Sequence, residues 1–188
     1  MVLGSRIAGT GSYAPARVLT NADLERLVDT SDQWITERTG IKERRIAADD
    51  ECTSDMALRA ARAALDAAQI QAPELDMIVV GTISPDRQLP ACATYLQQKL
   101  GIAGMPAFDV SAACAGFLYA LSIGDQFIRS GTHRHVLVVG VELLSRVINW
   151  ADRNTCVLFG DGAGAVVLAP APPPNRTQVF RSAQLMTR

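Results

Sequence analysis

Three short apolar runs constrain the fold of this chain more than any other feature of its sequence. The runs Met77–Thr82, 106–110 and Val136–Glu142 are mostly apolar at consecutive positions and lack the alternation of a half-buried strand. A strand that is apolar on both sides is buried on both faces, as strands of parallel sheets covered by helices are. We therefore predict an α/β fold in which a mostly parallel sheet is covered by layers of helices.

Helical patterns separate these runs. Thr53 is predicted to cap a helix through about Gln69, in which apolar residues recur every three or four positions. A second helix is predicted from Pro90 to Leu100 and ends at Gly101. Together with a third helix, described next, these segments give the order α-β-α-β-α-β from residue 53 onward.

The stretch Pro106–Phe117 centres on Cys114 and has the pattern of a nucleophile elbow. A strand leads into very small residues and then into a long helix, from about Ala115 to Ser130. Unpaired N–H groups and the dipole at a helix N-terminus favour the thiolate, the reactive form of cysteine. The alanines and Gly116 beside the sulfur leave room for an acyl group. We predict that Cys114 is a nucleophile and that its helix, apolar on several sides, forms a buried central layer.

No histidine is placed to act as a base for Cys114. The two histidines, His133 and His135, lie beyond the far end of the long helix, and His133 is roughly 28 Å from Cys114 at the helical rise. A papain-like hydrolase is disfavoured because it needs a cysteine–histidine contact. We expect backbone amides, or a group that this chain does not carry, to assist Cys114.

The first fifty residues and the last thirty have weaker patterns. The predicted elements before residue 53 are a strand Ser5–Tyr13, a short helix capped by Thr20 and Asn21 and running through Val28, and a short helix capped by Ser31 and ended by Gly40. Near the other end, Thr155–Phe159 and Ala165–Ala169 are predicted strands, joined by a hairpin at Asp161-Gly162. The glycine-rich segment 160–164 is not a dinucleotide loop, because a strand and not a helix follows it.

Composition excludes several classes of function. The chain has 188 residues, 48% hydrophobic residues and a net charge of −1, which gives no case for nucleic-acid binding. Its four cysteines form no C-x-x-C pair and have no histidine at ligand spacing, so we expect no metal site. We see no signal peptide and no apolar run long enough to span a membrane, and we predict a cytoplasmic protein with free thiols and no membrane partner.

Three motifs in this order resemble the β-ketoacyl-acyl-carrier-protein synthase III family of the thiolase superfamily. They are Asp29–Arg45 (DTSDQWITERTGIKERR), Asp109–Phe117 (DVSAACAGF), and Asp152-Arg153 followed by Phe159–Ala165 (FGDGAGA). The resemblance runs from about residue 5 to residue 169. It implies the first half of a five-layer α/β/α/β/α sandwich, with a buried central helix that starts at the nucleophile.

The resemblance implies a condensing enzyme that initiates type II fatty-acid synthesis. Cys114 would take an acyl group, typically acetyl, from acyl-coenzyme A, and its backbone N–H would donate to the oxyanion. Malonyl-acyl-carrier protein would then lose carbon dioxide and attack the acyl thioester. The implied partners are acyl-CoA, malonyl-acyl-carrier protein and a second copy in a homodimer. The resemblance implies no cofactor, since the coenzyme A thioester is a substrate.

The resemblance also assigns substrate contacts. Trp34 and Arg38 match positions that hold the adenine and phosphates of coenzyme A, with Thr30 and Arg153 nearby. An aromatic face stacks on a base and a guanidinium binds phosphate in a planar fork. Without the motif, a packed helix side chain and a solvated arginine would be as good an interpretation of Trp34 and Arg38.

Two further assignments concern the acyl group and the carrier protein. Leu89 matches a position that shapes the end of the acyl pocket across a dimer interface, where many members have phenylalanine. The basic cluster Lys42, Arg44 and Arg45 could contact an acidic carrier protein, although a solvated face is an equally good interpretation.

The chain departs from the family in its length. Members are nearly twice as long, and the family's catalytic histidine and asparagine lie in the half that has no counterpart here. We predict a thiolase-like N-terminal half-domain at 1–169 and a Pro-rich linker and tail at 170–188, which after Pro174 does not resemble the family's continuation. The sequence could be a fragment, one chain of a two-chain protein, or a truncated product inactive in condensation.

Three functional hypotheses therefore stand. The first is a condensing acyltransferase that uses Cys114. The second is a non-catalytic half or partner subunit of a thiolase-like complex. The third is a thiolase-like acyltransferase of secondary metabolism. The signature at Asp29–Arg45 favours the first over the third.

Overall fold

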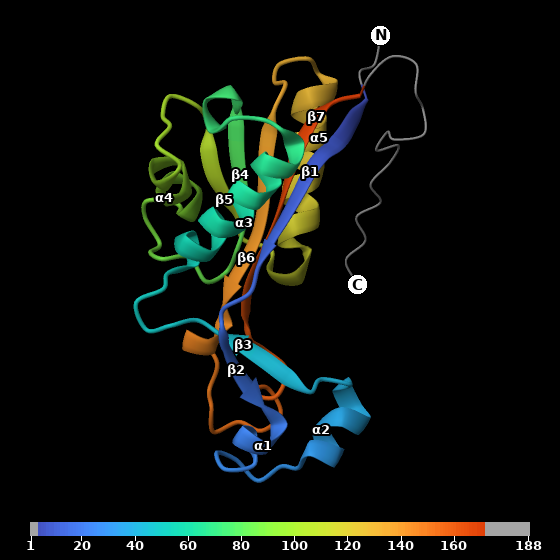
Figure 1. Cartoon of the computed structure of the whole chain (residues 1–188), viewed down its shortest axis with the longest axis vertical. Helices are drawn as coiled ribbons and strands as arrows, with labels where there is room; N and C mark the ends of the chain where they lie inside the picture. The colour runs from blue at the N-terminus through green and yellow to red at the C-terminus, as the bar shows by residue number, and fades with distance from the viewer. Residues whose placement is uncertain (1–3, 172–188) are drawn as a thin grey trace.

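The computed structural model describes residues 4–171 and shows a layered α/β part with a small lobe extending from one end (Figure 1). The strands are β1 (Ser5–Tyr13), β2 (Arg17–Thr20), β3 (Glu43–Ile46), β4 (Met77–Gly81), β5 (Ala107–Val110), β6 (Val136–Leu143) and β7 (Asp161–Pro170). The α-helices are α1 (Asn21–Leu24), α2 (Asp32–Thr39), α3 (Thr53–Ala68), α4 (Cys92–Lys99) and α5 (Gly116–Arg129), with short 3₁₀ turns η1 (Ala72–Glu74), η2 (Ala113–Ala115) and η3 (Leu144–Arg146).

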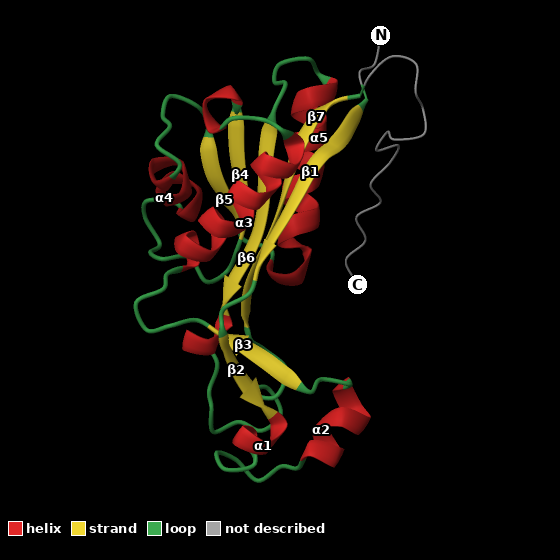
Figure 2. Ribbon diagram, in the orientation of Figure 1, coloured by secondary structure: helices red, strands yellow, loops and turns green. Residues whose placement is uncertain are grey.

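Strand β4 shows why the chain forms layers. All five of its residues are buried, and its four apolar side chains alternate between two separate hydrophobic clusters. Ile78 and Val80 pack with α3 and α4 on one face, while Met77 and Val79 pack with α5 on the other. Burial on both faces therefore requires a helix layer on each side of the sheet, as Figure 2 shows.

The main sheet has the order β1-β7-β6-β4-β5. β4 is parallel to β5 and β6, whereas β7 is antiparallel to both of its neighbours, β6 and β1. Four of the five strands therefore run in one direction, which confirms the predicted mostly parallel sheet. The carboxyl ends of β4, β5 and β6 meet at the edge from which the small lobe extends (Figure 1).

Close approach of α3 to β1 depends on residues without bulky side chains. Half of the buried residues of α3 are alanines, and the helix lies over two glycines of β1. A Cβ on Gly9 would lie 2.4 Å from the Ala64 carbonyl oxygen, and a Cβ on Gly11 would lie 2.2 Å from the Ala60 carbonyl oxygen. The helix backbone thus packs directly on the strand backbone.

The small lobe consists of residues 17–46 and 147–160 around its own core. β2 pairs with β3 in an antiparallel ribbon, and α1, α2 and the turns after η3 complete the lobe. The core residues of the lobe are Leu19, Leu24, Ile35, Ile46, Cys156 and Val157, with Val28, Trp34, Ile148 and Trp150 packed against them. The two predicted helices are present, capped by Thr20 and Ser31 and with Gly40 in the left-handed region, but the first ends at Leu24 rather than Val28.

The predicted hairpin at 155–169 is wrong. Residues 153–158 form turns, and Asp161–Pro170 is one continuous strand. Its first residue pairs with Leu143 of β6, and its third, Ala163, pairs with both β6 and β1. The Asp161 carboxylate accepts hydrogen bonds from the N–H of Ala47 and Ser145, so it anchors the start of the strand instead of forming a turn. Because segment 160–164 leads into this strand, the exclusion of a dinucleotide loop is confirmed.

Two remaining sequence expectations concern ends of elements. Cys52, not Thr53, is the N-cap residue of α3. The predicted linker and tail at 170–188 lie outside the described residues except for Pro170, which ends β7, and Ala171, whose N–H donates to the Gly4 carbonyl oxygen (2.8 Å). The division between residues 1–169 and 170–188 thus stays a prediction.

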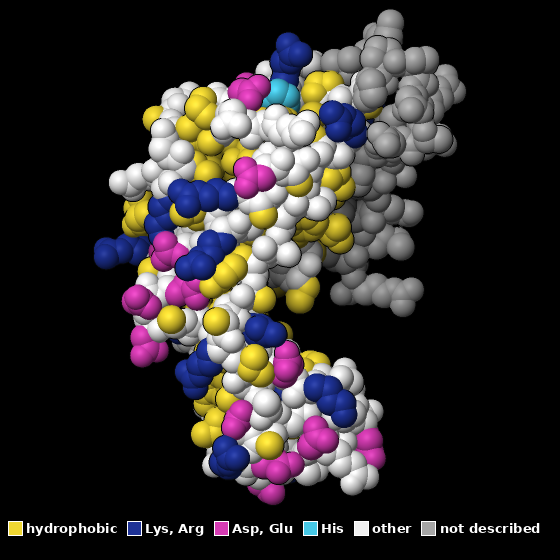
Figure 3. All heavy atoms as spheres, in the orientation of Figure 1, with side chains coloured by type: hydrophobic (Ala, Val, Ile, Leu, Met, Phe, Trp, Pro, Cys, Tyr) yellow, Lys and Arg dark blue, Asp and Glu magenta, His cyan; other side chains and the backbone are white. Residues whose placement is uncertain are grey.

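Surface and helix composition add two observations. On the face shown in Figure 3, basic and acidic side chains are mixed over both parts of the molecule rather than separated by sign. Among residues 4–171, every helix is too short or too polar to cross a bilayer.

The packing of α3 on β1 gives a first prediction. Gly11→Ala should lower the free energy of unfolding by about 2 kcal/mol, because the added methyl group forces the α3 backbone away from the sheet. Chemical denaturation monitored by circular dichroism measures this change.

Gly164→Ala is the matched control, since a Cβ there meets no atom within 4 Å. It should change the free energy of unfolding by less than about 0.5 kcal/mol. Equal destabilisation by the two substitutions would contradict the close-packing argument.

Candidate active site

Cys114 lies in the turn between β5 and α5, at the carboxyl edge of the sheet. The strand ends at Val110, and Cys114 is the middle residue of η2, directly before α5. Its side chain is exposed. The predicted strand–turn–helix arrangement is present, but α5 begins at Gly116, so Cys114 precedes the helix N-cap, Ala115, by one residue.

The backbone beside Cys114 is held in an uncommon conformation. Ala113 has a φ of 46°, in the left-handed region that non-glycine residues rarely adopt. Such a conformation costs about 1 kcal/mol or more and persists only where the surrounding structure enforces it. Here the enforcing structure is the tight passage from β5 into α5.

Gly116 has a different role from the one expected. We predicted that its small size leaves room for an acyl group, but Gly116 is buried beneath the start of α5. A Cβ on its neighbour across the contact, Gly81 of β4, would lie 2.6 Å from the Gly116 carbonyl carbon. The two glycines therefore let α5 start directly on the sheet, and this contact fixes the height of Cys114 above β4.

The other cysteines differ from Cys114 in their surroundings. Cys92 and Cys156 are fully buried, and burial raises the pKa of each thiol. Cys52 is partly exposed at the N-cap of α3. Of the four thiols, that of Cys114 is the exposed one, as a nucleophile requires.

The histidines lie at the opposite end of the sheet, as predicted. The His133 ring packs edge-on against Phe127 in the last turn of α5, and His135 Nδ1 lies 3.0 Å from the Glu74 carbonyl oxygen. Both residues follow the C-terminus of α5, whereas Cys114 precedes its N-terminus. In the described part of the chain, no histidine can serve as the base for Cys114.

Three of the four residues assigned to coenzyme A come together in the small lobe. The guanidinium carbon of Arg38 lies 4.4 Å from the centre of the Trp34 ring, and that of Arg153 lies 4.5 Å from it. Arg153 is far away in the sequence and also reaches the Asp29 carboxylate (3.5 Å). The fourth residue, Thr30, has a buried hydroxyl without a hydrogen-bond partner.

Arg44 is not part of a surface for a carrier protein, contrary to the prediction. It is 4% exposed, and its Nε donates to the Val157 carbonyl oxygen (3.0 Å) while Nη1 donates to Asn21 Oδ1. The Asn21 amide in turn donates to the Asp32 carboxylate (2.7 Å). Burial lowers the pKa of the Arg44 guanidinium. Arg44 thus ties α1 and α2 to the loop that carries Arg153.

The remaining predicted residues are on the surface. Lys42 is exposed, and Arg45 is half-buried, with a side chain that is 42% exposed and a guanidinium 3.3 Å from the Glu43 carboxylate. Leu89 is 84% exposed on the segment between β4 and α4. Their assignments to carrier protein and acyl group stay predictions.

Sequence reasoning missed two carboxylates near the carboxyl ends of β5 and β6, at the edge of the sheet that carries Cys114. Asp109 of β5 accepts hydrogen bonds from the N–H of Cys92 (2.7 Å) and Ala93 (2.8 Å), and burial raises the pKa of its carboxyl. Glu142, near the end of β6, accepts hydrogen bonds from the segment after β4. The signal in the sequence was an acidic residue inside an otherwise apolar strand, which needs buried partners.

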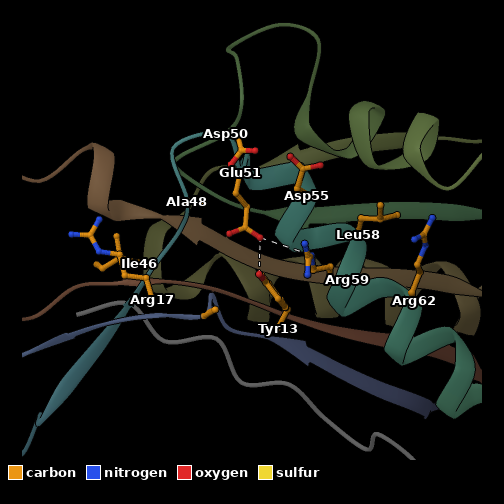
Figure 4. A pocket seen from close by; sticks show the side chains of 11 residues that line it. Tyr13, Arg17, Ile46, Ala48, Asp50, Glu51, Asp55, Leu58, Arg59 and Arg62 are labelled. Carbon is orange, nitrogen blue, oxygen red and sulfur yellow. Dashed lines mark hydrogen bonds and ion pairs between the residues drawn. The ribbon is translucent and has the colours of Figure 1, made fainter.

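A large hollow of the described surface lies elsewhere, between α3 and the loop before it (Figure 4). It measures about 910 Å³, and at its centre Tyr13 Oη donates to Glu51 (2.7 Å) beside Arg59. This hydrogen bond raises the pKa of the Tyr13 hydroxyl. Its central polar groups are paired with one another, and it contains none of the predicted site residues.

The burial of the cysteines gives a second prediction. Iodoacetamide should alkylate Cys114 in the folded protein, while Cys92 and Cys156 should react only after unfolding, because both thiols are buried. Peptide mass mapping before and after addition of denaturant checks this. Alkylation of Cys92 in the folded protein before Cys114 would contradict the structure.

The Arg44 network gives a third prediction, with the adjacent arginine as control. Arg44→Met should lower the free energy of unfolding by about 2–4 kcal/mol, because Val157 and Asn21 lose buried donors. Arg45→Met should change it by less than about 0.5 kcal/mol, since that ion pair is exposed. Urea denaturation compares the two variants, and similar losses would show that the Arg44 contacts contribute little.

Comparisons with known proteins agree with this geometry. Residues 108–187 match the family model described as 3-oxoacyl-[acyl-carrier-protein (ACP)] synthase III. The match extends beyond Pro174, where we expected the resemblance to stop. The chain is 60% identical to the β-ketoacyl-[acyl-carrier-protein] synthase III of Thiobacillus denitrificans over 172 residues, which cover 91% of this chain and 54% of that protein.

Solved structures show the same relationship. The 3-oxoacyl-[acyl-carrier-protein] synthase III of Aquifex aeolicus VF5 has a TM-score of 0.87 and 55% identity, covering 89% of this chain and 54% of its own. The priming β-ketosynthase from the R1128 polyketide biosynthetic pathway has a TM-score of 0.87 and 43% identity, covering 89% of this chain and 50% of its own. The chain spans about half the length of the curated relatives it matches. In sequence and in fold, this chain is therefore a relative of the β-ketoacyl-[acyl-carrier-protein] synthases III and corresponds to their N-terminal portion.

Proposed function

We propose that this chain provides the acyl-accepting half of a condensing enzyme that starts type II fatty-acid synthesis. The observation that supports this most directly is the exposed thiol of Cys114 at the strand–helix turn. Trp34, Arg38 and Arg153 form a cluster in the small lobe, which we call the Trp34 cluster. The small lobe extends from the same edge of the sheet (Figure 1). A reactive sulfur and a site for a nucleotide tail on one edge fit an acyl-coenzyme A thioester.

In the proposed first step, the Cys114 sulfur attacks the thioester carbonyl of acyl-CoA, and the proposed primer is acetyl-CoA. The carbonyl oxygen becomes an oxyanion, to which the Cys114 backbone N–H would donate. The C–S bond to coenzyme A then breaks, and the coenzyme leaves as a thiolate that takes up a proton. The acyl group stays on Cys114 as a thioester.

The Trp34 cluster would hold the other end of coenzyme A. The Arg38 and Arg153 guanidiniums lie over the indole ring, so the adenine would stack on the ring in place of one of them, and both arginines would keep positive charge beside it. Guanidinium groups bind phosphates in bidentate geometry. The buried, unpartnered Thr30 hydroxyl is a further group of this region that a ligand could satisfy.

The second step, decarboxylative attack by malonyl-acyl-carrier protein, is proposed for the whole enzyme. The resemblance assigns a histidine and an asparagine to it, and neither has a counterpart near Cys114 in the described residues. The proposal includes a homodimer in the cytoplasm and needs no cofactor besides the coenzyme A thioester. Lys42 and Arg45 remain proposed carrier-protein contacts.

A second candidate is an acyltransferase of secondary metabolism. The similarity to the R1128 priming β-ketosynthase favours it, since that structure shares the fold at 43% identity. The higher identity to synthases III from Thiobacillus denitrificans and Aquifex aeolicus favours the first candidate.

Acyl transfer to Cys114 is the fourth prediction. Incubation with acetyl-CoA should add one acetyl group to the chain, and Cys114→Ala should abolish the adduct. Intact mass spectrometry and peptide mapping measure both outcomes. An unchanged adduct in Cys114→Ala would refute the nucleophile assignment.

Coenzyme A binding is tested separately, by calorimetry on the Cys114→Ala chain. Trp34→Ala or Arg153→Ala should raise the Kd for coenzyme A about tenfold, by loss of stacking or of a phosphate partner. Arg26→Ala is the control, because Arg26 lies in the same lobe but pairs with Asp23 (2.9 Å). Binding without an acetyl adduct would support the non-catalytic half, and the absence of both would refute the proposal.

A further inference from the structure

The segment Thr82–Ala91, between β4 and α4, begins next to the strand that leads into the nucleophile turn; we call it the arm. It begins there because β4 and β5 end in register, with Gly81 opposite Val110. The Thr82 N–H donates to the Val110 carbonyl oxygen (3.2 Å), four residues before Cys114. The first residue of the arm is therefore fixed to the strand that leads into the nucleophile turn.

Glu142 of β6 binds the start of the arm. Its carboxylate accepts hydrogen bonds from the Ile83 N–H (3.0 Å), the Thr82 hydroxyl (3.3 Å) and the Ser84 hydroxyl. The Ser84 oxygen also accepts the N–H of Leu143 (2.8 Å), the residue after Glu142. One carboxylate thus binds three consecutive residues of the arm.

The middle and the end of the arm have their own anchors. Asp86 accepts hydrogen bonds from the N–H (2.8 Å) and the hydroxyl of Ser54, at the start of α3. At the far end, Asp109 accepts the N–H of Cys92 (2.7 Å). Leu89 lies between these anchors and is 84% exposed, so an apolar side chain is presented on a fixed support.

The Glu142 contacts are charge-assisted. Among the ion pairs within residues 4–171, none involves Glu142, so N–H and O–H donors from the arm balance its carboxylate. Hydrogen bonds to an ionised group are roughly twice as strong as neutral ones. Removing the charge of Glu142 should therefore loosen the arm more than a change at any other anchor. Glu142→Gln removes this charge and keeps the size of the side chain.

We propose that Glu142 is a positioning residue: through Thr82, Ile83 and Ser84 it holds the arm so that Leu89, at the interface of the proposed homodimer, limits the length of the acyl group that Cys114 accepts. This inference rests on the proposed function, because it needs acyl transfer to Cys114. It goes beyond that function in naming a residue that would select the substrate without touching it.

The fifth prediction is the first part of the test. It measures the local order of the arm by hydrogen exchange with mass spectrometry. Glu142→Gln should speed exchange in peptides covering 82–90 about tenfold, the factor for losing hydrogen bonds to a charged group. Ser84→Ala should speed it less, since the Ile83–Glu142 contact remains. Glu74→Gln is the matched control: Glu74 also accepts a backbone N–H, that of Gln71 (2.8 Å), but before β4, at the opposite edge of the sheet.

The second part of the test measures chain-length selectivity, as the ratio of the Cys114 acylation rate with octanoyl-CoA to the rate with acetyl-CoA. Glu142→Gln should raise this ratio about fivefold, and Leu89→Ala should raise it similarly, because each opens the space for a longer chain. If Glu142 acts through Leu89, the double variant should match Leu89→Ala within about a factor of two. A residue with a structural role alone would slow both acyl groups equally.

The outcomes separate this proposal from the proposed function. Faster exchange with the selectivity pattern above supports it. If hydrogen exchange in 82–90 is unchanged in Glu142→Gln, Glu142 does not anchor the arm. If exchange is faster but the ratio of octanoyl to acetyl transfer is unchanged, Glu142 has no role in selectivity. If the unmodified chain accepts no acyl group, the proposed function and the selectivity role both fail, and the exchange measurement then decides the anchor by itself. Ser84→Ala decides the anchor if Glu142→Gln does not fold.

Discussion

The burial of β4 on both faces is the constraint on which the rest of this structure depends. Its side chains alternate between two hydrophobic clusters, so α3 and α4 must cover one face of the sheet and α5 the other. The parallel strands are joined by crossovers that contain covering helices, and parallel strands end at one edge. The nucleophile turn after β5, the arm after β4 and the small lobe are therefore brought to the same edge. The buried residues of β4 take no part in the proposed reaction, but their burial decides where the nucleophile turn lies.

Small residues and lone carboxylates refine this edge. Gly81 and Gly116 let α5 start in direct contact with β4, and the left-handed Ala113 turns the chain so that Cys114 is exposed. Carboxylates on the two strands that flank β4, Asp109 of β5 and Glu142 of β6, then fix the segments around it through backbone N–H groups. The site thus rests on backbone geometry enforced from several elements, which is how a strained turn can persist.

The small lobe is organised by a buried arginine. Arg44 joins the loop after η3 to α1 and, through Asn21, to α2. These are the elements that carry the two arginines packed on Trp34. The sequence predicted Arg44 to be part of a basic surface cluster. In the structure, Arg44 is buried and supports the proposed coenzyme A site from inside the lobe, whereas the side chain of its neighbour Arg45 is partly exposed. Adjacent positions on a strand face opposite sides, and only the partner elements decide which side is the interior.

The sequence by itself determined the local structure: the apolar runs that became β4, β5 and β6, the caps at Ser31 and Gly40, and the strand–turn–helix around Cys114. These depend on periodicity and on neighbours within a few residues, which a sequence displays directly. The motifs also predicted the grouping of Trp34 with Arg153, by resemblance. The tertiary structure alone decided that 161–170 is one strand, that Arg44 is buried, and that Glu142 binds the arm. Each of these depends on a partner more than fifteen residues away, and the free energy of such long-range pairing overrides local turn and surface preferences.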